Sequence, residues 1–261
     1  MELKVWTRYF PLSIYVRDII TSGRIGTVYR TFADLSMAMP PEETFDDSHR
    51  MVNPDLAGGA LLDLGIYALT WVFQTLYTTQ KSPQAPSVTS QIRKYKTGAD
   101  EHTSMLLNFP RSEEGDAHGI ATTSMRVAAD PGGKATAGPS IRIQGAEGEI
   151  QVYHPAFRPS RTKLILKDGT VEDKQWDFPG PGKGSGWKNG FGGSWQAEGE
   201  GQGMFWEADE CAFALKEGRK EGKHESLEES LVIMKTMDEV RKQNGLKYPE
   251  KIETLDYPVD L

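Results

Sequence analysis

The sequence predicts an α+β protein in which one mostly antiparallel sheet is flanked by helices. Apolar residues recur at helical spacing twice before residue 80, and again in two segments after residue 203. Between these regions, short strand-like segments follow one another from Ser87 to about Asp177 with turns and no helices between them. Consecutive strands joined this closely pair as antiparallel neighbours, so a meander is expected. The 261 residues are interpreted as one domain, 1–261, without a dinucleotide-binding domain.

The first elements alternate helix, strand and helix. A helix is expected from Pro11 to Ser22 and a long strand from Thr27 to Met37, where β-forming residues alternate. After a proline-containing loop, Gly58-Gly59 opens an apolar segment that ends near Tyr77 and is long enough to be a buried helix. Gly65 inside it costs about 1 kcal/mol relative to alanine, so we expect a packing or functional reason for it.

The middle of the chain is predicted to be strands and turns, followed by a glycine-rich segment. Segment 179–203 interleaves its glycines with Trp187, Phe191 and Trp195. It is either a long surface loop or a flap that closes its aromatic side chains over a pocket. The expected strands are 87–97, 101–109, 117–127, 140–145, 149–153, 161–167 and 170–177.

Two helices are expected at the end, 204–218 and 226–244. Ser226 and Glu229 have the spacing of a capping box at the start of the second. The apolar stripe of the first helix includes Cys211, which is therefore predicted to pack in the core rather than act as a nucleophile. That stripe consists of Phe205, Ala208, Cys211, Ala212 and Leu215.

Composition and charge exclude several classes of function. The net charge of −7 disfavours binding to nucleic acid or to an anionic membrane surface. A single cysteine cannot form an internal disulfide, which together with the lack of a long apolar run predicts a cytoplasmic protein. The five histidines are not at ligand spacing, so no metal site is predicted. The glycines of 180–186 do not fit a phosphate-binding loop, and no G-x-S-x-G motif is present.

The best candidates for chemistry are Asp63 and Tyr67. On a helix they are four residues apart and share one face. A carboxylate in an apolar helix needs a partner, because burying it alone costs several kcal/mol. The two are either an acid/base pair, or Asp63 simply bonds a neighbouring loop. In Trp6-Thr7-Arg8-Tyr9-Phe10, the large side chains could line a pocket or be ordinary core, and Arg8 is the candidate contact for a substrate or anion.

Several long motifs give the chain a resemblance to a known family. These motifs are Trp6–Pro11, Gly58–Tyr67, Ile141–Ile150, His154–Pro159, Met204–Glu210 and Met234–Arg241. Together they resemble the C-terminal half of Gfo/Idh/MocA oxidoreductases, and more narrowly the branch of dimeric dihydrodiol dehydrogenases and NADP-dependent D-xylose dehydrogenases in its fungal form. The resemblance extends over nearly the whole chain.

The resemblance implies an open sheet with helices on one face, and a homodimer formed through the other face. It also implies a pocket for a small-molecule substrate, in which Tyr67 exchanges a proton with the substrate hydroxyl and Asp63 orients it. Trp6, Phe157 and Trp187 are expected to contact the substrate with Arg8.

The family's N-terminal Rossmann half, which holds NADP and the lysine of a Glu-Lys-Pro segment, has no counterpart in this sequence. We therefore predict an isomerase, lyase or cyclase of specialised metabolism that acts without a cofactor, with NADP used only if a separate Rossmann domain is supplied. The alternatives are a truncated or split NADP-dependent oxidoreductase that needs such a partner, and a non-catalytic remnant for dimerisation or ligand binding.

Overall fold

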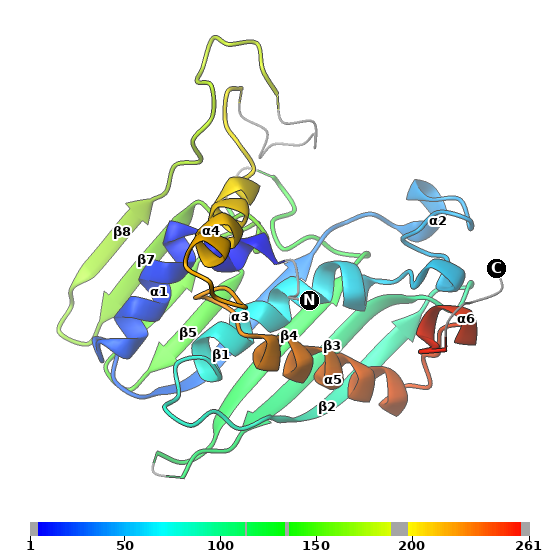
Figure 1. Ribbon diagram of the computed structural model, residues 1–261, viewed down its shortest axis with the longest axis horizontal. Helices are drawn as coiled ribbons and strands as arrows, with labels where there is room; N and C mark the ends of the chain where they lie inside the picture. Colours follow the sequence, from blue (N-terminus) through cyan, green and yellow to red (C-terminus); the bar gives the residue numbers. More distant parts are fainter. Residues whose placement is uncertain (1–4, 113, 134–135, 189–197, 257–261) are drawn as a thin grey trace.

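The computed structural model describes residues 5–112, 114–133, 136–188 and 198–256. Its centre is one eight-stranded sheet in the order β2-β3-β4-β1-β5-β6-β7-β8 (Figure 1). Neighbouring strands are antiparallel except for β1 and β4, which run parallel. The strands are β1 Val28–Ser36, β2 Ser87–Lys94, β3 Asp100–Phe109, β4 Ala117–Ser124, β5 Ile141–Gly145, β6 Gly148–Val152, β7 Arg161–Leu166 and β8 Val171–Gln175.

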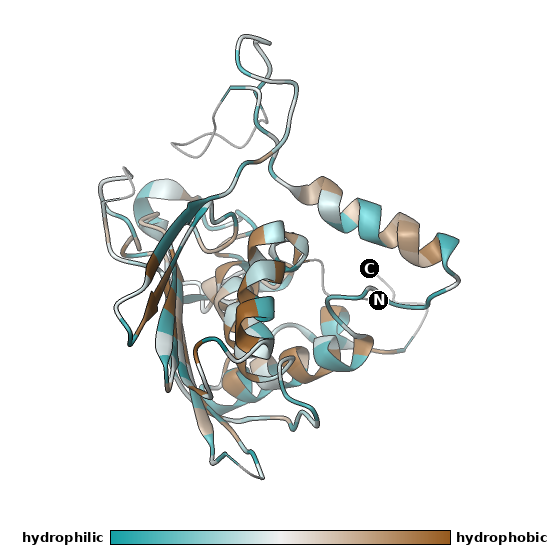
Figure 2. Cartoon of the chain, turned by 90° about the vertical axis from the view of Figure 1, so that its left-hand side faces the viewer, coloured by the Kyte–Doolittle hydropathy of each residue, from teal (hydrophilic) through white to brown (hydrophobic). Residues whose placement is uncertain are grey.

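The longer helices gather on one face of this sheet, and within the described residues no long helix covers the opposite face (Figures 1 and 2). This confirms the predicted α+β arrangement of a mostly antiparallel sheet with helices on one face. The α-helices are α1 Pro11–Thr21, α2 Pro41–Thr44, α3 Ile66–Leu76, α4 Met204–Lys216, α5 Leu227–Gln243 and α6 Glu250–Glu253. Shorter helical turns are η1 Trp6–Tyr9, η2 Pro54–Leu56 and η3 Leu61–Gly65, of which η3 is a π-helix.

The expected uninterrupted meander is wrong at one place. Strand β1 lies between β4 and β5, so these two strands are not neighbours. Residues 125–140 join β4 to β5 and are too long for a tight hairpin, which leaves room for a third strand between them. Strand β1 is paired on both edges, through Ala33 with Ala121 on one side and Ile141 on the other.

The core lies between the sheet and α3. Trp71 and Phe73 on this helix are fully buried, and each such side chain contributes about 1.5–3 kcal/mol through the hydrophobic effect. Gly65 has the packing reason that its position in an apolar helix suggested. A Cβ atom there would lie 3.2 Å from Cγ2 of Thr123 on β4, closer than ordinary van der Waals contact. The glycine therefore lets the start of the helix approach the sheet.

The two C-terminal helices differ in how they pack. Helix α5 begins at the predicted N-cap, since the Glu229 N–H donates to Oγ of Ser226 at 3.1 Å, but the Glu229 side chain pairs with Arg8 instead of completing the capping box. Helix α4 does not pack as predicted, because Ala214 is its one buried residue and Cys211 is exposed. The apolar stripe expected to face the core instead faces away from it. In the described ranges, no helix combines the length and the apolar character needed to cross a membrane.

Candidate functional site

The helix that carries Asp63 and Tyr67 is held at its start by a buried carboxylate. Asp100, at the beginning of β3, is 1% exposed and accepts the Leu61 N–H at 2.7 Å and the Thr103 hydroxyl at 2.9 Å. A Cβ atom on Gly59 would lie 2.0 Å from Oδ1 of Asp100, and the φ of Gly59 is 141°. Only glycine fits there. Burial raises the pKa of Asp100 to about 6, although its hydrogen bonds act in the opposite direction.

Asp63 lies on the π-helical turn η3 and is paired with a neighbouring loop. Nη1 of Arg50 is 2.6 Å from Oδ1 of Asp63, and the side chains are 66% and 33% exposed. A pair this exposed contributes at most about 1 kcal/mol to stability. The pairing supports the second of the two interpretations of Asp63, as a carboxylate that bonds a neighbouring loop. Its role as an orienting partner of Tyr67 stays a prediction.

Tyr67 lies in a cluster of aromatic side chains from three separate segments. Its ring centroid is 5.8 Å from that of Trp6 and 6.0 Å from that of Phe157. The indole N–H of Trp6 donates to the Phe157 carbonyl oxygen at 3.0 Å, and the Thr7 hydroxyl donates to the same oxygen. Three of the residues predicted to form the site, Trp6, Tyr67 and Phe157, are therefore brought together.

The surroundings of Tyr67 keep its phenol protonated. Burial is the main cause of a strongly raised pKa, and the negative charges of Asp63 and Glu207 raise it further. At neutral pH the hydroxyl is therefore a neutral hydrogen-bond donor, and the raised pKa makes loss of its proton less favourable. Such a group suits an oxygen on which negative charge develops, as when a carbonyl is reduced to an alcohol.

Arg8 is a buried residue of an ion pair, which the sequence did not predict. Its side chain is 0% exposed and forms an ion pair with Glu229 of α5, while its Nε donates to the His224 carbonyl oxygen at 3.0 Å. Its Nη2 also lies 3.4 Å from the Thr78 hydroxyl. A guanidinium enclosed in this way joins η1 to α5 and has no surface for a substrate. Contact with a substrate stays an untested prediction, which this burial argues against.

Trp187 is separated from the aromatic cluster. It is 43% exposed, and the described residues give it no ring contact with Trp6, Tyr67 or Phe157. The segment that carries it projects beyond the end of the sheet (Figure 1). Phe191 and Trp195, the other aromatic residues of the predicted flap, lie outside the described residues. The flap and a substrate contact of Trp187 remain predictions.

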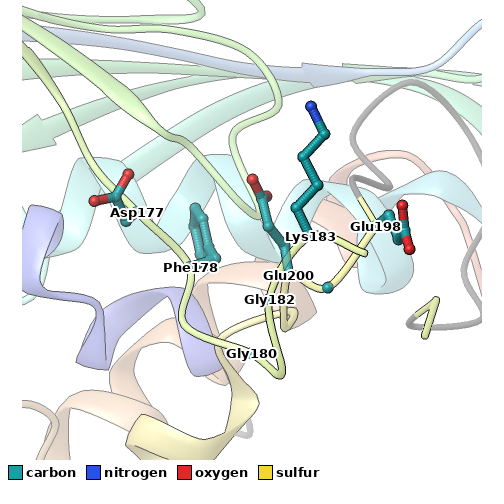
Figure 3. Close-up of a pocket in the computed structure, with 8 residues that line it drawn as sticks. Asp177, Phe178, Gly180, Gly182, Lys183, Glu198 and Glu200 are labelled. Carbon is teal, nitrogen blue, oxygen red and sulfur yellow. The ribbon is translucent and has the colours of Figure 1, made fainter. Parts of the chain in front are cut away.

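A cavity of about 430 Å³ lies at the base of this glycine-rich segment (Figure 3). Lys183, Glu198 and Glu200 line it together with Asp177 and Phe178. Tyr67 is not among its lining residues. The base of the segment is held in place by Phe178, whose ring is 5.2 Å from Phe10 and 3.7 Å from the guanidinium carbon of Arg158.

Three residues that shape the site were not identified from the sequence. Arg50 pairs with Asp63, Asp100 closes the start of the helix, and Glu207 on α4 adds negative charge near Tyr67. Each is remote in sequence from the residue it affects, so no local pattern in the sequence pointed to it. Within the parts of the chain that are described, no three His, Cys, Asp or Glu residues are grouped so that they could hold a metal ion.

Comparison with known proteins finds dehydrogenases. The chain is 49% identical over 257 residues to D-xylose 1-dehydrogenase (NADP(+)) of Hypocrea jecorina. The aligned region covers 96% of this chain and 61% of that protein. The chain is 29% identical over 246 residues to human trans-1,2-dihydrobenzene-1,2-diol dehydrogenase, covering 94% of the chain and 62% of the relative. The chain therefore spans less than two thirds of the length of these relatives.

Solved structures show the same fold. An aldose-aldose oxidoreductase from Caulobacter crescentus in complex with glycerol superposes with a TM-score of 0.65 at 14% identity, covering 93% of this chain and 61% of that one. A 3-ketoreductase from Actinomadura kijaniata in complex with NADP and TDP-benzene gives 0.64 at 17% identity, covering 94% and 62%. Likeness at this identity supports the architecture alone.

These findings correct two predictions about function. An isomerase, lyase or cyclase was expected, whereas the relative at 49% identity is a dehydrogenase, so that prediction is wrong and the oxidoreductase alternative is favoured. Action without a nicotinamide was expected too, whereas the name of the same relative specifies NADP(+). The error arose because the absence of a dinucleotide motif was taken to mean a change of chemistry.

The family is shown by a match that covers more than half of the chain. Residues 14–151 match the family described as GFO/IDH/MocA C-terminal domain. This range begins in α1, includes the helix with Asp63 and Tyr67, and ends in β6, so it takes in the centre of the sheet as well as the candidate site. The chain belongs to the Gfo/Idh/MocA oxidoreductase family and matches the C-terminal domain of that family.

Proposed function

We propose that this chain is the substrate-binding part of an NADP-dependent oxidoreductase that interconverts a hydroxyl and a carbonyl group on a sugar or a cyclic diol. The observation that carries the proposal is the 49% identity to D-xylose 1-dehydrogenase (NADP(+)) over 96% of the chain. The aromatic cluster around Tyr67 supports it, since apolar ring faces beside one polar group are typical of small-molecule sites.

In this proposal Tyr67 handles the proton at the substrate oxygen. A bound nicotinamide would supply or accept the hydride. The phenol, kept neutral by burial and by nearby carboxylates, donates to the carbonyl oxygen in the direction of reduction. Trp6 and Phe157 pack against the ring of Tyr67 and hold it in place. The Trp6 indole is itself fixed by its bond to the Phe157 carbonyl.

The described residues do not offer a site for the dinucleotide itself. Its phosphates would need a glycine-rich turn between a strand and an open helix N-terminus. The glycine at the start of α4, Gly203, faces aromatic rings instead: a Cβ atom there would lie 2.7 Å from Phe10 and 2.8 Å from Trp206. Strand β1 is followed by Met37-Ala38-Met39-Pro40, which contains no glycine. We therefore propose that a further domain binds the NADP.

A chimaera tests the proposal. It joins the part of the Hypocrea jecorina enzyme that this chain does not match to the N-terminus of the intact chain. NADPH formation is then measured with D-xylose and with a trans-dihydrodiol. Turnover of either is expected, and Tyr67→Phe should lower kcat by about 10²–10⁴-fold.

Tyr29→Phe is the matched control for this test. Tyr29 is also a tyrosine but is 50% exposed at the start of β1, so its variant should keep the activity of the parent. A chimaera that binds NADPH and turns over neither substrate would refute the proposed function. Full activity of Tyr67→Phe would refute the role of Tyr67.

We also propose a homodimer formed through the uncovered face of the sheet, and a cytoplasmic location. Half-buried Phe32, exposed Leu106 and half-buried Ile120 alternate with residues that face the helices, so they support an apolar contact there. Sedimentation equilibrium should give twice the 29.0 kDa mass of the chain. A parent chain that is monomeric, or a dimer that Leu106→Lys leaves intact, would contradict this contact.

A further inference from the structure

A second cavity, of about 570 Å³, lies beyond the end of α3 that is remote from Tyr67. It is formed by the end of α1 and the start of β1, by the segment that follows α3, and by the turn between β3 and β4. Tyr67 is in the first turn of α3, and the 11 residues of this helix span roughly 16 Å. The cavity is therefore separate from the candidate site, and its volume suits a small molecule.

The cavity is lined by a buried cation whose charge is only weakly compensated. The side chain of Arg111, in the turn after β3, is 10% exposed. Its Nη2 donates to the Val28 carbonyl oxygen at 2.6 Å, and its Nη1 lies 3.4 Å from Oε2 of Glu114, whose side chain is 55% exposed. Its Nε is buried and has no hydrogen-bond partner among the described residues. Since a buried charge is costly unless it is paired and hydrogen-bonded, an anion beside this guanidinium would be stabilising.

The other groups that line the cavity can bind hydroxyl groups and add positive charge. Thr27, Ser82 and Ser112 contribute hydroxyls, and Gln84 contributes an amide. These four side chains have no hydrogen-bond partner within the part of the chain that is described, and neither does the exposed ammonium of Lys81. Donors and acceptors of this kind match a ligand that carries several hydroxyl groups.

Two helices end beside this cavity, and free carbonyl groups at their C-termini would favour a cation. Side chains bind several of these carbonyls, however. The Thr79 hydroxyl donates to the Thr75 carbonyl oxygen at 2.9 Å, and the Gln80 amide donates to that of Leu76. At the end of α1 the Thr21 hydroxyl acts in the same way. The side chains then determine the preference, and two cations against one carboxylate give the lining a formal charge of +1 in a chain of net charge −7.

We infer that this cavity binds a small anion that is rich in hydroxyl groups, either a phosphorylated sugar or a sugar acid. The Arg111 guanidinium binds the phosphate or carboxylate, for which its planar fork of N–H donors is suited, and Lys81 adds charge. The hydroxyl and amide side chains bind the sugar. A nucleotide is disfavoured, because none of the described residues that line the cavity is aromatic and could stack on a base. The inference goes beyond the proposed function and does not depend on it.

Isothermal titration calorimetry of the 261-residue chain at low ionic strength tests the inference. The ligands are glucose 6-phosphate, gluconate, glucose and inorganic phosphate. At least one sugar anion should bind at a single site, about tenfold or more tighter than glucose and than inorganic phosphate. The tighter of the two identifies the preferred anionic group. Glucose that binds as well as both sugar anions, or no saturable binding of either anion below about 10 mM, would refute the inference.

Variants of the lining show where the anion binds. Arg111→Gln should raise its Kd by about tenfold or more. Ser112→Glu places a negative charge at the cavity and should have a similar effect, whereas Ser112→Gln, which is matched in size, should keep the Kd of the parent. Arg161→Gln on β7, at an arginine paired with Asp173 outside the cavity, should also leave the Kd unaltered.

The Ser112 pair decides the outcome if Arg111→Gln does not fold, since Ser112 is exposed and its side chain has no partner among the described residues. Circular dichroism and the Tm of each variant establish that it is folded. A Kd that Ser112→Glu leaves at the value of Ser112→Gln would place the anion elsewhere and overturn the inference.

Discussion

Replacing Asp100 by asparagine removes a buried negative charge at the start of the helix that carries Tyr67, while nearly keeping the shape of the side chain. The remaining oxygen can still accept the Leu61 N–H and the Thr103 hydroxyl, which are bonded to Oδ2 in the parent. The other oxygen, Oδ1, is buried and has no hydrogen-bond partner among the described residues. The substitution therefore mainly tests the cost of burying the carboxylate.

The size of the effect follows from the pKa of Asp100. Burial raises it from 3.8 to about 6. At about 1.36 kcal/mol per pH unit, this difference corresponds to roughly 3 kcal/mol in the free energy of unfolding. The folded chain keeps a proton that the unfolded chain has already released, so this stabilisation is fully present below about pH 3.8. It is lost as the pH rises through about 6.

Urea unfolding followed by tryptophan fluorescence measures this dependence. The free energy of unfolding of the parent minus that of Asp100→Asn should fall by roughly 3 kcal/mol between about pH 4 and about pH 7. The subtraction removes the contribution of other carboxylates, which titrate in both proteins. Asp55→Asn, at an exposed aspartate, is the matched control for the substitution itself. A difference that stays constant with pH, or rises, would refute the assignment of a buried charge to Asp100.

Three further substitutions test the fold around the site. Glu229→Ala leaves the Arg8 guanidinium buried without its counter-ion, so urea unfolding should show a loss of about 3–5 kcal/mol; a loss below about 1 kcal/mol would contradict the enclosure. Arg50→Ala removes an exposed partner of Asp63 and should cost at most about 1 kcal/mol in the same assay, and a larger cost would mean that the pair is better shielded. Gly59→Ala adds a Cβ atom at a φ of 141° and should lower the Tm by several degrees, at a cost of about 1–3 kcal/mol, whereas an unchanged Tm would refute the strain.

Local patterns in the sequence predicted most of the secondary structure, but they did not predict the position of β1 in the sheet. Alternation, periodicity and turn residues are local, so they located β2 to β8 and the helices α1, α3, α4 and α5 to within a few residues, whereas the short α2 and α6 were not predicted. The placement of β1 between β4 and β5 depends on pairing between residues far apart in the sequence, such as Ala33 with Ala121. No local signal encodes such a choice.

The site followed in part from the sequence. The aromatic residues Trp6, Tyr67 and Phe157 were identified, and the structure brings them together. Arg8 was interpreted as a ligand contact because an arginine among aromatic residues fits either a pocket or a core. Its partner, Glu229, had already been assigned to a capping box, so nothing pointed to a buried ion pair. The stripe of α4 was assigned to the core for a similar reason, since periodicity shows that a face is covered but not by what.

Strand β1 also has a consequence for the order in which the chain folds. The segments β2–β4 and β5–β8 are each made of strands that pair with their neighbours in sequence, so each can form early. Their only junction in the sheet is β1, which must pair with partners far along the chain on both sides. We expect this late insertion to limit the folding rate. Until it occurs, the inner edges of β4 and β5 stay open to pairing with other chains, which makes this intermediate the stage most prone to aggregation.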